Sequence, residues 1–73
     1  MTKQNQGIVY YQIRLGCHIE THQQYWFDDL SVRNLDDGDC ILAGPIPDQA
    51  ALFGILLKIR DLGLTLISVN RDQ

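Results

Sequence analysis

At 73 residues the chain has room for one domain, and a domain this short buries only about 60% of the surface that it would expose when unfolded. Its hydrophobic content of 45% is typical of a globular domain and argues against a disordered chain. The net charge is −3, and the six basic residues are scattered along the chain. This balance disfavours nucleic acid or an anionic membrane surface as a partner.

The sequence shows no apolar run near the roughly 20 residues of a membrane span, and residues 1–7 are polar and resemble no secretory signal. We therefore expect a cytoplasmic protein in which Cys17 and Cys40 stay reduced. Residues 1–7 are expected to form a disordered tail before a single α+β domain over residues 8–71.

In the first half of the domain, residues 8–15 alternate between apolar and more polar side chains, which predicts a strand. Gly16 permits a bend at its end. Thr21 and Gln24 have the spacing of a capping box, which predicts a short helix over residues 21–29. Three adjacent aromatic residues within it, Tyr25 to Phe27, cannot all face one side of a helix.

In the second half, residues 30–35 and 40–44 read as two strands joined by a tight turn at Asp37-Gly38, and hence as an antiparallel hairpin. Pro45 and Pro47 are expected to end the second of these strands. A helix should then begin at Asp48 as N-cap, or with Pro47 as its first residue, and end at residue 61 or 62 before Gly63. Its core-facing stripe is Leu52, Ile55, Leu56, Ile59 and Leu62.

The last predicted strand, residues 64–69, is apolar on both faces, a pattern typical of a central strand. The element order β-α-β-β-α-β predicts a ferredoxin-like two-layer sandwich. In that fold a four-stranded antiparallel sheet carries both helices on one face. The same fold, however, places the last strand at an edge, where its apolar side chains would be partly exposed unless another chain covers them.

The segment from Gly44 to Val69 resembles a family of short, functionally unassigned bacterial proteins. The shared pattern consists of Gly44-Pro45, Asp48 to Leu52, Gly54, Arg60 to Leu64 and Ser68-Val69, with Trp26-Phe27-Asp28 upstream. Phe53 stands where that family often has His. The resemblance implies a small cytosolic bacterial protein and implies no activity.

Several residues invite a chemical role, and for each we prefer a structural interpretation. Cys17, His18, His22 and Cys40 lack the paired spacing of a zinc site. A nucleophile–base pair of Cys17 and His22 has no third group to orient it. The acidic residues 36, 37 and 39 lack the glycine spacing and the final Glu of a calcium loop. We therefore expect no metal, no cofactor and no catalytic site.

The outward side of the sheet, with Tyr10, Arg14 and Arg33, resembles RNA-binding sheets only loosely, because the aromatic and glycine motif of those sheets is absent. We expect this face to be half-solvated or covered by a second copy.

The most suggestive feature is the flank of the second helix beside its core stripe, where Phe53 and Leu57 are one turn apart next to the small residues Ala50 and Gly54. The first helix, through Trp26 or Phe27, is expected to pack against this flank. The functional alternative is a protein–protein contact anchored by Phe53 with an aromatic residue such as Tyr25 or Trp26.

We therefore expect a small non-catalytic interaction or regulatory module that forms a homo-oligomer or docks on a larger protein. The alternative is a small-molecule-binding regulatory domain of the ACT type, for which the glycine after the first strand, Gly16, is the cue. Binding of a metabolite would distinguish the two, because it would raise the melting temperature.

Overall fold

The computed structural model describes residues 9–27 and 30–72, so the predicted tail over residues 1–7 and the end of the first predicted helix lie outside the described residues. Its elements are β1 (Val9–Leu15), the 3₁₀ helix η2 (Thr21–Phe27), β2 (Ser31–Asn34), β3 (Cys40–Ile46), α1 (Gln49–Asp61) and β4 (Leu66–Asp72). Neither of the helices in these two ranges has the length and apolar composition needed to cross a membrane.

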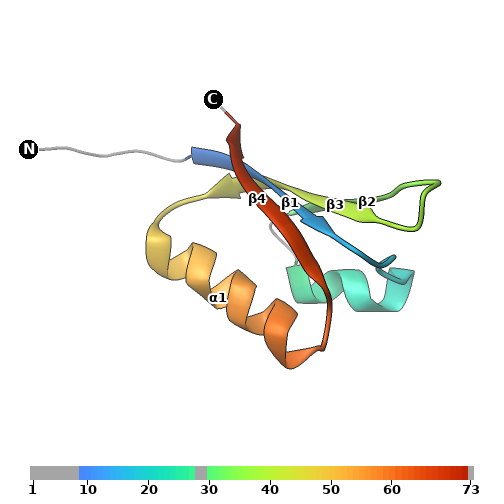
Figure 1. The fold of residues 1–73 in the computed structure, drawn as a ribbon. Helices are drawn as coiled ribbons and strands as arrows, with labels where there is room; N and C mark the ends of the chain where they lie inside the picture. Colours follow the sequence, from blue (N-terminus) through green and yellow to red (C-terminus); the bar gives the residue numbers. More distant parts are fainter. Residues whose placement is uncertain (1–8, 28–29, 73) are drawn as a thin grey trace, which may run out of the picture.

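The strands form one four-stranded sheet in the order β2-β3-β1-β4, and every neighbouring pair is antiparallel. Both helices lie beneath the same face of this sheet (Figure 1). The prediction of a small α+β protein with a four-stranded antiparallel sheet and two helices is confirmed.

The core lies between the sheet and the helices. Its most deeply buried members are Ile13, Leu15, Ile19, Leu42, Ile46, Ile59 and Cys40. Most are inward-facing residues of β1 and β3, because alternate residues of a strand share one face. The helix α1 supplies only Ile59, while its neighbours along the stripe are half-buried.

The helix α1 forms as predicted. The side chain of Asp48 accepts a hydrogen bond from the amide of Ala51 at 2.8 Å, which satisfies one of the free donors at the helix start. At the other end Gly63 has a φ of 73°, a conformation that glycine adopts without a steric penalty. The turn at Gly38, with a φ of 95°, is likewise confirmed.

The first predicted helix is a 3₁₀ helix, and the expected capping box at Thr21 and Gln24 is wrong. The side chain of Gln23 instead accepts from the amide of Glu20 at 3.0 Å, and the amide of Gln23 donates to the carbonyl of Glu20 at 2.8 Å. The turn therefore closes over three residues around Glu20, which is the tighter 3₁₀ spacing.

The prediction that Pro45 ends the third strand is also wrong, because Pro45 pairs with Tyr10 inside β3. The amide of Leu35 donates to the carbonyl of Asp39, so these two residues are a hydrogen-bonded pair of the hairpin. Hydrogen-bonded pairs recur at every second residue of an antiparallel ladder. Odd-numbered residues of β3 therefore direct their backbone groups toward β2. Pairing with β2 stops at Ala43, so the missing amide of Pro45 faces a side without a strand, where proline is tolerated.

The strand β4 lies at an edge of the sheet, beside β1, and not at its centre as its composition suggests. Leu66 and Ile67 are 44% and 50% exposed. The composition of β4 suggests a central position because a strand with apolar side chains on both faces is usually buried on both faces. Among residues 9–27 and 30–72 of a single copy, no segment covers the second face of β4.

Candidate interaction surface

The outer flank of α1 is exposed. Phe53 and Leu57 are 56% and 49% exposed, and Ala50 and Gly54 beside them are exposed as well. The prediction that the first helix packs into this flank is wrong, since a Cβ atom added at Gly54 would meet no atom within 4 Å. The described residues therefore leave an apolar helix surface without a cover.

The space around Gly54 leads to a prediction for stability. Replacing Gly54 with alanine should raise the free energy of unfolding of a single copy by about 0.5–1 kcal/mol, because alanine is the better helix former and its methyl group meets no neighbour. Urea denaturation at a concentration where the protein is monomeric measures this change. A loss of stability would mean that another group closely approaches Gly54.

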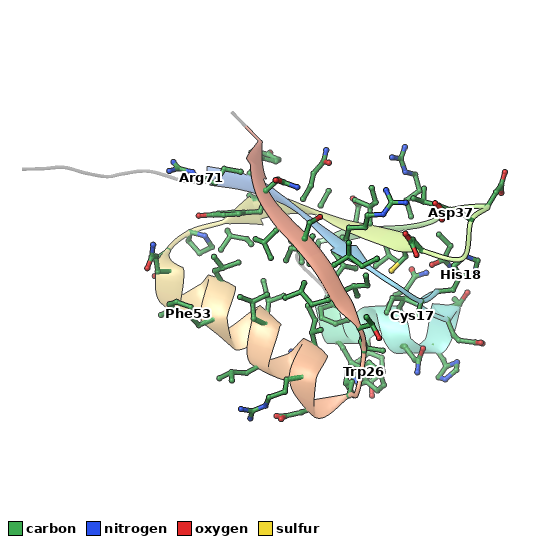
Figure 2. All side chains as sticks on the ribbon, viewed as in Figure 1. Cys17, His18, Trp26, Asp37, Phe53 and Arg71 are labelled. Atoms are coloured by element: carbon green, nitrogen blue, oxygen red, sulfur yellow. The ribbon has the colours of Figure 1, made fainter. Side chains whose placement is uncertain are left out.

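The aromatic residues of η2 lie apart from Phe53. Figure 2 shows Phe53 near the start of α1 and Trp26 close to its end. Trp26 is half-buried against the core, whereas Tyr25 is exposed and its ring centre lies 5.5 Å from that of Trp26. Tyr25 and Phe53 therefore do not form the single anchor cluster that the sequence suggested.

The two helices meet through Lys58, a residue that no sequence pattern singles out. Its Nζ atom donates to the backbone carbonyl of Trp26 at 2.9 Å. Successive residues of an α-helix are rotated by 100°, so Phe53 and Lys58 project about 140° apart around the axis. Phe53 therefore lies on the flank of α1 that faces away from η2.

The charged side chains around Arg14 on the outward face of the sheet are paired with one another. Arg14 donates through Nε to Asp39 at 2.8 Å and through Nη2 to Asp37 at 2.7 Å. The hydrogen bond to Asp39 is the main cause of the raised pKa of Arg14, and burial opposes it. A shallow depression of about 130 Å³ beside Arg14 is lined by Gln12, Arg14, Ile41, Ser68 and Asn70. Arg14 is the only charged residue that lines this depression, and it is already paired with Asp37 and Asp39. We therefore expect the depression to bind a ligand weakly at most.

The residues considered for metal binding or catalysis do not gather into a site. Within residues 9–27 and 30–72, no group of three or more His, Cys, Asp and Glu side chains could hold a metal ion. His18 contacts the carbonyl of Leu35 through Nε2 at 2.7 Å. Cys40 is fully buried, and its burial raises the pKa of its thiol to about 11, so it is protonated and unreactive at neutral pH.

Gly16, the cue for an ACT-type domain, lies beside the segment that leads into β4. Its amide donates to the carbonyl of Thr65 at 2.8 Å. A Cβ atom there would lie 3.4 Å from the side chain of Thr65 and 3.5 Å from that of Ile67. These are ordinary van der Waals distances, so packing against this segment does not require a glycine.

The two edges of the sheet differ in a way that the sequence did not reveal. At the β2 edge, the Asn34 side chain accepts from the amide of Ile19 at 2.9 Å and donates to its carbonyl at 3.0 Å. This edge has only four residues and is covered at one end. The β4 edge has seven residues and two exposed aliphatic side chains.

The described residues form a small α+β protein with a four-stranded antiparallel sheet, two helices and an exposed apolar flank on α1. The chain belongs to the family described as domain of unknown function DUF8691, whose model matches residues 10–70. Comparison with the curated proteins and with the solved structures finds no match.

Proposed function

We propose that this protein is a small non-catalytic interaction module that binds protein, with the outer flank of α1 as its contact surface. The observation that carries the proposal is the exposure of Phe53 and Leu57 in a helix that buries only one residue completely. Large apolar side chains grouped on one face mark interaction sites more often than single exposed residues do. Aromatic residues such as Phe53 are also enriched at protein interfaces.

Under this proposal the protein acts in the cytoplasm. It associates with itself or docks on a larger protein, and Phe53 and Leu57 are the anchors beside Ala50 and Gly54.

We further propose that its architecture is ferredoxin-like. Support comes from the two central strands β1 and β3 and from the two helices beneath one face. In this fold the sheet edges and the outer helix surfaces remain available to partners.

The proposal is tested by replacing Phe53 with serine and measuring association by sedimentation equilibrium at micromolar concentration. We expect the variant to associate at least about tenfold more weakly, because truncation of a buried aromatic anchor typically costs more than 1 kcal/mol. The matched control is Tyr10→Ser, since Tyr10 is also 56% exposed but lies on the sheet.

Equal association of the two variants would place the contact elsewhere. A protein that stays monomeric throughout, and whose solubility and stability are unchanged by Phe53→Ser, would contradict the proposed function.

A further inference from the structure

The strand β4 presents free backbone hydrogen-bonding groups along its outer side. The amide of Gly16 donates to the carbonyl of Thr65, which shows that even-numbered residues at this end of β1 face β4. The register then pairs Gln12 with Asn70 and Arg14 with Ser68 as hydrogen-bonded partners. It follows that the amide and carbonyl groups of Val69 and Arg71 point outward, away from β1.

This edge has few of the features that prevent strands from pairing. Exposed edges are usually short, or carry charged side chains, proline or a bulge, or are covered by another segment. The strand β4 contains neither lysine nor proline, its charged residues Arg71 and Asp72 are confined to its last two positions, and its register shift lies at the other end, opposite Arg14 and Leu15. The β2 edge, by contrast, is short and covered at Asn34.

From this contrast we infer that β4 pairs antiparallel with β4 of a second copy of the chain, about a two-fold axis near Val69. The inference rests on the proposed function and names the partner and the strand that it uses. It joins the two sheets into one of eight strands, with hydrogen bonds from Val69 and Arg71 of each copy. Isologous pairing of this kind is closed and gives a dimer.

The position of α1 favours a second copy over a foreign peptide. The helix connects β3 to β4 and η2 connects β1 to β2, so α1 lies on the β4 side of the helical layer (Figure 1). Phe53 projects from the flank of α1 away from η2. Pairing through β4 therefore places the two α1 helices beneath the same face of the joined sheet, each with Phe53 on the side of α1 away from η2. A peptide strand would cover the edge and leave Phe53 exposed.

The area of the contact points the same way. A stable interface buries roughly 1,200 Å² or more in total. Two half-exposed side chains on each α1 supply only a few hundred Å², on the order of the area that single aromatic residues bury. The strand edge and the helix flank together offer a larger area than either alone.

Amide hydrogen exchange on the unaltered protein tests the inference. The amides of Val69 and Arg71 should become at least about tenfold more protected as the concentration rises through the dimer range, because exchange then requires dissociation. The amide of Val32, which points outward from the β2 edge, is the internal control and should not change. Concentration-independent exchange at Val69 in a sample that sediments as a dimer would refute edge pairing.

A pair of variants at one position provides the second test. Val69→Pro removes an outward amide without breaking the pairing with β1, whereas Val69→Ala keeps the amide and loses a similar amount of packing. We expect the proline variant to dimerise about tenfold more weakly than the alanine variant, because one hydrogen bond is lost from each copy.

Equal dimerisation of the two variants would contradict the inference. If Phe53→Ser still disrupted that dimer, the proposed function would stand and only the edge pairing would be wrong.

Discussion

Replacing Ile59 with alanine should lower the free energy of unfolding by about 2–5 kcal/mol, the range for removing a large aliphatic side chain from a core. Ile59 is 2% exposed and is the only residue of α1 that is completely buried. A domain of this size has a total stability of only about 5 kcal/mol. The variant should therefore retain at most about 3 kcal/mol of this stability, because its sheet loses much of the packing of its main helix.

Circular dichroism during urea denaturation measures this effect. The matched control is Leu57→Ala on the same helix, which should change the stability of a monomer by less than about 1 kcal/mol because Leu57 is half exposed. Similar losses for Ile59→Ala and Leu57→Ala would mean that α1 packs against the sheet through a different face.

The second large effect is a loss of stability at alkaline pH that depends on Cys40. Burial raises the pKa of its thiol from 9.0 to about 11 in the folded protein. Between these values the unfolded chain loses a proton that the folded chain keeps, so raising the pH favours unfolding. The contribution of Cys40 is unchanged below pH 9 and declines by about 2–3 kcal/mol as the pH approaches 11.

The measurement is the midpoint of urea denaturation at several pH values from 8 to 11, for the unaltered protein and for Cys40→Ala. The alanine variant is less stable at pH 8 because it leaves a small cavity, but its stability should decline less steeply with pH. Every other residue is identical in the two proteins, so the difference between the two curves isolates the contribution of Cys40. Parallel curves would show that the thiol ionises as easily in the folded state as in the unfolded state.

The elements with strong local signals were predictable from the sequence. The helix α1 has an N-cap at Asp48, an apolar stripe and a glycine at its end, and each of these acts within one or two turns. The hairpin between β2 and β3 follows from the turn at Gly38, which adopts a positive φ. Local backbone preference and burial agree in these segments, so the pattern alone was sufficient.

The features that local composition misjudged depend on neighbours distant in the sequence, although the predicted order of elements did place β4 at an edge. Whether Pro45 fits inside a strand depends on where β2 stops, and whether β4 is central depends on the order of the strands. The apolar residues of β4 indicate burial without saying what buries them. Within the described residues of a single copy, Leu66 and Ile67 stay about half exposed.

The candidate surface was predictable only in part. The helical spacing of Ala50, Phe53, Gly54 and Leu57 was sufficient to place them on one flank, but not to show that the first helix leaves it free. Lys58 makes the contact between the helices through its long side chain, and no pattern marks it in advance. The outward direction of the Val69 amide follows from the pairing register, which the sequence does not specify.

The mass of the unaltered protein in solution, followed by sedimentation equilibrium from nanomolar to high micromolar concentration, tests the central claim most directly. The chain has a mass of 8.3 kDa, and we predict a reversible transition from this value to twice this value as the concentration rises. A constant mass of one chain over the whole range, with Phe53 and Leu66 still open to solvent, would contradict the account.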